Sequence, residues 1–159
     1  MKFEKFLKMA AGHGVIVEDN DEIKYLLFDG AMLRIPDGTN VIAPLTMGER
    51  PFMTNVLEAI ADDEITEADL TGAKLPTPDA SASKVIRIFT DVEGGEFGIT
   101  NKGFALIEKS DAVYTAYDRD YNDENPVALV ILTGYGEDEK IAGIIFDDDY
   151  FAKKINERE

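Results

Sequence analysis

The sequence predicts an α+β protein in which mostly antiparallel β-meander sheets accompany an N-terminal helix, a middle helix and a short C-terminal helix. Three observations support this fold class. Short apolar runs alternate with turn-forming residues over most of the chain, and three segments repeat apolar residues at helical spacing. The 159 residues, 45% of them apolar, are enough to bury a core.

The chain begins with a short amphipathic helix followed by a three-stranded meander. Gly12 lies just beyond the helical repeat and suits a helix end. Asp29-Gly30 separates the last two strands, and both residues tolerate the positive φ of a tight type I′ turn. The apolar side chains at helical spacing are Phe3, Phe6, Leu7 and Ala10. The expected strands span residues 15–17, 23–28 and 31–35.

A second helix is expected from Pro51 to about Ala61. Proline suits the first turn of a helix, because its missing N–H has no partner there. Thr66 and Asp69 have the spacing of a capping box, which predicts a further helical turn in this region. The apolar side chains that repeat at helical spacing are Met53, Val56, Leu57 and Ile60.

Residues 71–84 combine prolines with small polar residues and form the best linker candidate. The sequence therefore predicts an N-terminal lobe over residues 1–72, a linker over 73–84 and a β-rich C-terminal lobe over 85–159. Because each lobe alone would have a thin core, one compact domain is the open alternative.

The C-terminal half reads as β-strands followed by a helix. The runs "PVALVILT" and "IAGIIF" lack a polar side, which indicates strands covered on both faces. Acidic residues 147–149 precede the last segment and suit a helix N-terminus. Residues 104–109 fit either a strand or a helix. The expected strands span residues 84–91, 96–100, 112–117, 127–133 and 141–146.

The composition excludes several kinds of site. Without cysteine the chain has no disulfide, thiolate nucleophile or Cys-ligated zinc, and one histidine cannot build a His-rich metal centre. No apolar run approaches the length of a membrane-spanning helix, so no membrane partner and a cytoplasmic location are expected. The formal charge of −16 argues against direct nucleic-acid binding.

The acidity has two interpretations. It is spread over both halves of the chain, which suits a surface that keeps the protein soluble. Alternatively, the carboxylates imitate a nucleic acid and inhibit a DNA-binding protein. The most one-sided acidic segment is the first place to look for a basic protein partner. Its members are Glu58, Asp62, Asp63, Glu64, Glu67 and Asp69.

The stretch "YDRDYNDEN" begins like a calcium-binding loop. An EF-hand starting at Asp118 would need glycine at its sixth position and glutamate at its twelfth, where this chain has Asp123 and Leu129. An irregular calcium site is the remaining alternative to an acidic turn, and calcium is the only cofactor considered. Its ligands would be Asp118, Asp120, Asn122 and Glu124.

Two stretches, "KFEKFLKMAAGHG" and "GITNKGFALIEKSD", resemble segments of uncharacterised bacterial proteins encoded by phages and prophages. The resemblance implies a small structural or accessory component that is cytoplasmic or assembled into a phage particle. With no catalytic motif in view, we expect a non-enzymatic acidic protein that acts through contacts with a protein partner or by self-association. The DNA mimic and the calcium-binding module are the alternatives.

Overall fold

The computed structural model describes residues 1–42, 45–62, 64–76, 85–118, 125–133, 140–148 and 150–151. The helices are α1 (Phe3–Ala10), α2 (Pro51–Ala61) and α3 (Asn101–Phe104). The strands are β1 (Val15–Glu18), β2 (Lys24–Phe28), β3 (Ala31–Arg34), β4 (Leu45–Gly48), β5 (Ile65–Pro76), β6 (Val85–Asp91), β7 (Glu96–Thr100), β8 (Ala112–Ala116), β9 (Ala128–Thr133) and β10 (Lys140–Phe146).

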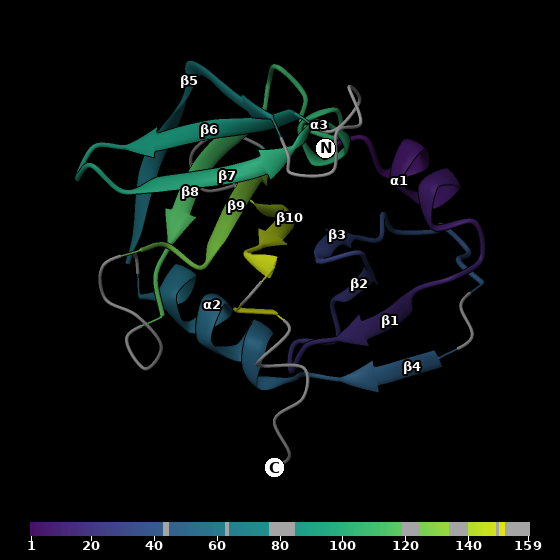
Figure 1. Cartoon of the computed structure of the whole chain (residues 1–159). Coiled ribbons are helices and arrows are strands. Elements are labelled where there is room, and N and C mark those ends of the chain that lie inside the picture. The colour runs from purple at the N-terminus through teal and green to yellow at the C-terminus, as the bar shows by residue number, and fades with distance from the viewer. Residues whose placement is uncertain are drawn as a thin grey trace.

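The protein is a mixed α/β fold built on one mostly antiparallel sheet of ten strands (Figure 1). The order is β4-β1-β2-β3-β10-β9-β8-β5-β6-β7, so three groups of three consecutive strands lie side by side. Among the described strands, the parallel pair is β1 with β4, which lies at one edge of the sheet. A single meander would keep all strands in chain order, and the sheet departs from that order where β3 meets β10 and β8 meets β5.

The central strands bury side chains on both faces, as the apolar runs predict. Along β9, Ala128, Val130 and Leu132 belong to one hydrophobic cluster, whereas Leu129 and Ile131 belong to another. This alternation follows from the two-residue period of a strand. Both clusters combine residues of the predicted lobes 1–72 and 85–159, so these segments share their cores.

Different elements cover the two faces of the sheet. Helix α2 contributes Phe52, Met53 and Val56 to the first cluster, all with no exposed surface. Helix α1 and the β6–β7 hairpin close the second cluster, to which they contribute Phe6 and Phe97 among others. In Figure 1, α2 lies below strands β8 and β9, and α1 lies at the upper right, on the far side of α3 from the tip of the β6–β7 hairpin.

The turn between β2 and β3 confirms the prediction made from Asp29-Gly30. The φ angles are 52° at Asp29 and 76° at Gly30, and the strands pair from Phe28 and Ala31 outward. Positive φ at both central residues is the requirement of a type I′ turn. A hairpin of this kind sets the register of β2 and β3 locally, before any tertiary contact is made.

The segment after α2 corrects two predictions. The expected helical turn at Thr66 and Asp69 is wrong, because Ile65–Pro76 is the longest strand, β5. Residues 73–76 of the predicted linker 73–84 also belong to β5, and residues 77–84 lie outside the described residues. β5 pairs with β8 over its first residues and with β6 afterwards. Strand pairing on two sides outweighs the weak local preference for a helical turn.

The chain end agrees with the expected helix as far as it is described. The Phe151 N–H donates to the carbonyl of Asp147 at 2.9 Å, and the Tyr150 N–H donates to the Asp147 carboxylate at 3.2 Å. Asp147 therefore caps a helical turn. Residues 152–159 lie outside the described part. Among the described residues, no helix is both long and apolar enough to cross a membrane.

Candidate functional site

The predicted calcium ligands are described only at Asp118. Its side chain is 3% exposed, and Oδ2 accepts a hydrogen bond of 2.8 Å from Asn55 Nδ2 on α2. Asp120, Asn122 and Glu124 lie outside the described residues. The described residues contain no group of three or more acidic or histidine side chains placed to hold a metal ion. Asp118 fastens α2 to the end of β8, and calcium binding stays a prediction.

The predicted partner-binding acids lie at the end of α2 and along β5. The described members, Glu58, Asp62, Glu64, Glu67 and Asp69, are all exposed, and Asp63 lies outside the described part. Glu67 and Asp69 alternate along β5 and so share one face of that strand. The surface is available for a basic partner, and its use remains a prediction.

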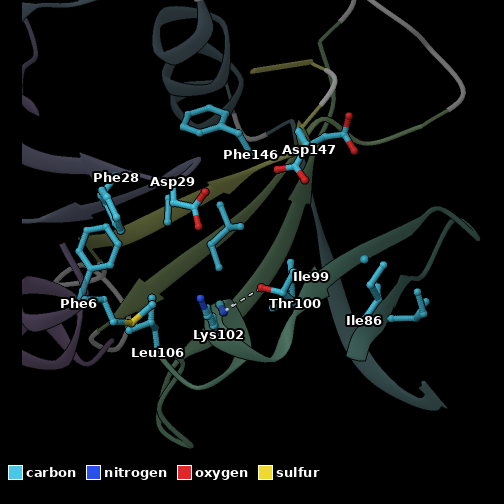
Figure 2. A pocket seen from close by; sticks show the side chains of 17 residues that line it. Phe6, Phe28, Asp29, Ile86, Ile99, Thr100, Lys102, Leu106, Phe146 and Asp147 are labelled. Carbon is cyan, nitrogen blue, oxygen red and sulfur yellow. Dashed lines mark hydrogen bonds between the residues drawn. The ribbon is translucent and has the colours of Figure 1, made fainter. Parts of the chain in front are cut away.

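A groove of about 730 Å³ lies between α1, the β6–β7 hairpin and the end of β10. We call it the α1–β7 groove. Most of its lining residues are apolar, and Figure 2 shows the rings of Phe6 and Phe28 side by side. These rings meet edge to face with centroids 6.4 Å apart. The apolar lining residues are Phe6, Met9, Phe28, Ala31, Ile86, Ile88, Ile99, Leu106, Ile145 and Phe146.

Three exposed carboxylates, Asp29, Asp147 and Asp148, also line the groove. They come together because the type I′ turn approaches the end of β10, where the Phe146 N–H donates to the Gly30 carbonyl at 2.9 Å. A cation is present as well, since Lys102 on α3 is exposed at the same groove. Within the described chain, neither Asp29 nor Lys102 belongs to an ion pair.

The groove extends toward the N-terminal helix as a shallower cavity of about 520 Å³. This cavity shares Met9, Phe28, Asp29 and Lys102 with the groove and adds Lys5. The surface therefore offers an apolar floor with carboxylates on one part of its rim and ammonium groups on another. An apolar side chain with a basic residue next to it would complement the floor and the carboxylate part of this rim.

A buried carboxylate that sequence reasoning missed lies at the end of β6. Asp91 is 4% exposed, and its Oδ2 accepts hydrogen bonds of 2.7 Å from both Thr115 Oγ1 and Tyr117 Oη. Its Oδ1 accepts from the backbone N–H groups of Glu93 and Gly95 at 3.0 and 2.8 Å. In the sequence, the Asp-x-x-Gly-Gly pattern of residues 91–95 indicates the loop between β6 and β7. The two hydroxyl partners, 24 and 26 residues away, had no local signal.

The electrostatics of this network follow from its geometry. Burial acts to raise the pKa of Asp91, but the hydrogen bonds from Thr115, Tyr117 and the turn outweigh it, so the pKa lies below its usual value. Burial, followed by the hydrogen bond to Asp91 and its negative charge, raises the pKa of Tyr117 to about 12. The carboxylate is ionised and fully used within the protein, which indicates a structural role.

We expect the Tyr117 hydroxyl to make stability sensitive to alkaline pH. A folded-state pKa raised from 10 to about 12 gives a contribution that is present below pH 10 and is lost as pH rises through 12. Urea unfolding midpoints between pH 9 and 12 test this. Tyr117→Phe should lose less stability than wild type over that interval, and equal losses would contradict the assignment.

The comparisons with known proteins do not extend these observations. No protein-family model, curated protein or solved structure matches the chain.

Proposed function

We propose that this chain is a non-enzymatic acidic protein that acts through protein–protein contacts, with the α1–β7 groove as its contact site. The partner segment would place an apolar side chain on the groove floor and a lysine or arginine beside Asp29, Asp147 and Asp148. The phage or prophage context, and a place in the cytoplasm or a phage particle, belong to the same proposal.

The observation that carries the proposal is an apolar groove with charged side chains at its rim, of which Asp29 and Lys102 form no ion pair within the described chain. Its half-exposed floor residues include Met9, Phe28 and Ile86, which are large side chains that a partner would cover. Burial of such side chains supplies affinity, whereas the rim charges select the partner and its orientation. The formal charge of −16 also speeds the approach of a basic segment at low ionic strength.

A displayed library of random 12-residue peptides, selected on the immobilised protein, tests this proposal. We expect enriched peptides with an aliphatic or aromatic residue flanked by lysine or arginine. Met9→Lys places a charge on the groove wall and should weaken their binding at least about tenfold, which corresponds to 1.4 kcal/mol. Met47→Lys, a matched change at a half-buried methionine of β4, should leave binding unchanged.

The same peptides also show whether the contact site is the α1–β7 groove or the acidic surface of α2 and β5. If Glu58→Gln with Glu67→Gln abolishes binding and Met9→Lys does not, then the acidic surface is the contact site and the groove proposal is wrong. Selection without any enriched peptide, or peptides that bind Met9→Lys as tightly as wild type, would also contradict it.

A further inference from the structure

A second cavity, independent of the α1–β7 groove, lies between α2 and the far ends of β1, β2 and β3. It measures about 440 Å³ and Tyr25 is one of its lining residues, so we call it the Tyr25 pocket. Half-buried apolar residues, including Ile23, Leu57 and Ile141, form one part of its lining. This volume lies within the range of small-molecule sites.

The Tyr25 hydroxyl is the unusual group in this pocket. The side chain as a whole has no exposed surface, yet its hydroxyl forms no hydrogen bond with any described residue. Tyr25 is one of the residues that line the pocket, so this unpartnered hydroxyl belongs to the pocket wall. Because buried hydroxyl groups normally form hydrogen bonds, we expect this hydroxyl to form one with a ligand bound in the pocket.

Arg34 is the charged neighbour of Tyr25 on the adjacent strand. It is the antiparallel partner of Tyr25 on β3, it also lines the pocket, and it has no ion pair within the described part of the chain. Burial, and then the charge of Asp19, raise the pKa of Tyr25 to about 12, so its hydroxyl carries a proton at neutral pH. A hydroxyl donor next to a guanidinium fork is suited to a carboxylate.

Negatively charged carboxylates also line the Tyr25 pocket, in addition to the positively charged Arg34. Asp21 and Glu58 are exposed at the pocket, and Glu49 also lines it. Glu49 Oε2 is occupied by hydrogen bonds from Asn20 and Thr54, both 3.0 Å long, which hold the β1–β2 turn against α2. Asp19 lines the pocket as well, and its Oδ1 accepts hydrogen bonds of 2.9 Å from the backbone N–H groups of Asp21 and Ile23. The carboxylates of Asp21 and Glu58 accept no hydrogen bond within the described chain and are the partners for a cationic group.

We infer that the Tyr25 pocket binds a free amino acid with an apolar side chain. Tyr25 and Arg34 would hold its carboxylate, Asp21 and Glu58 would attract its ammonium group, and Ile23, Leu57 and Ile141 would cover its side chain. A dianion such as phosphate is disfavoured, since the carboxylates lining the pocket outnumber Arg34 and Lys140. The inference does not rest on the proposed protein contact, which uses a different surface.

Titration with L-leucine, followed by backbone amide chemical shifts of the ¹⁵N-labelled protein, tests this inference. We expect saturable shifts at Ile23, Tyr25 and Leu57. Two matched probes each lack one charged group: 3-methylbutylamine lacks the carboxylate and 4-methylpentanoate lacks the ammonium. Each should bind at least about tenfold more weakly than leucine, because one set of ionic partners is left unused.

Tyr25→Phe removes only the hydroxyl and should weaken leucine binding about tenfold. Tyr117→Phe, which removes a hydroxyl that donates to Asp91 and does not line the pocket, is the matched control and should bind leucine like wild type. The inference is overturned if leucine causes no saturable shifts in the pocket, if the amine binds as well as leucine, or if Tyr25→Phe retains wild-type affinity. None of these outcomes would change the expected result of the peptide selection, which tests the α1–β7 groove separately.

Discussion

Replacing Asp91 with alanine is expected to lower the free energy of unfolding by about 3 kcal/mol, because several polar groups lose their acceptor at once. The Thr115 and Tyr117 hydroxyls and the Glu93 and Gly95 N–H groups all donate to this carboxylate. Thr115 retains a 3.3 Å contact with the Thr66 carbonyl, whereas the Tyr117 hydroxyl has no second bond of this kind within the described chain.

Urea unfolding followed by circular dichroism at pH 7 measures this loss, and Asp91→Asn is the matched control. The amide keeps the size and one acceptor oxygen, so we expect a smaller loss than in the alanine variant. Because the folded-state pKa of Asp91 is lowered, its ionic contribution is present above pH 4 and is lost as pH falls through the folded-state value. An alanine variant as stable as wild type would show that the network does not stabilise the fold.

The Asp91 network also explains why the turn needs glycine at position 95. A Cβ there would overlap the Tyr117 hydroxyl and approach Asp91 Oδ2 to 2.6 Å. The turn can therefore bring its backbone N–H groups to the carboxylate only when residue 95 has no side chain. The network connects the β6–β7 hairpin to β8, and that hairpin forms a wall of the α1–β7 groove.

Replacing Phe52 with alanine is expected to lower the free energy of unfolding by about 4 kcal/mol, the range typical of a buried aromatic side chain. Phe52 has no exposed surface and anchors α2 on the sheet. Its ring meets those of Phe146 and Phe151 edge to face, with centroids 5.3 and 5.1 Å away. Losing this ring leaves a cavity between α2 and the end of β10.

Thermal and urea unfolding measure this effect, with Phe52→Leu as the volume-matched control and Glu58→Gln as the surface control on the same helix. We expect the leucine variant to lose markedly less stability than the alanine variant, and Glu58→Gln to change it by less than about 0.5 kcal/mol. Comparable stability of Phe52→Ala and wild type would mean that α2 does not depend on this contact.

The fold could be predicted in part from the sequence, whereas the predicted partner-binding and calcium sites stay predictions. The acidic residues of α2 and β5 are exposed as a partner surface requires, and Asp118 is committed to a hydrogen bond with Asn55. Neither the α1–β7 groove nor the Tyr25 pocket was visible from sequence, because their walls come from distant segments. Phe6 meets Phe28 and Ile99 in one cluster, and Tyr25 meets Leu57 in the other. Cavities depend on which elements become neighbours, and local patterns carry little information about that.

The sequence by itself determined those features that depend on a few adjacent residues. Asp29-Gly30 sets a type I′ turn, the repeat in Phe3–Ala10 sets a helix, and the apolar run of β9 sets a strand buried on both faces. Each follows from φ preference or from a side-chain period of 3.6 or 2. These are local effects, so they can be recognised without the rest of the chain.

Only the tertiary structure decided β5 and the order of the strands. The segment Ile65–Pro76 has a mixed local pattern that fitted a helical turn and a linker, and it becomes a strand because β8 and β6 supply hydrogen-bonding partners. In the same way, β10 lies beside β3 although more than 100 residues separate them. Backbone pairing between distant segments is a property of the assembled sheet, and it therefore settles those parts of the fold that no short stretch of sequence encodes.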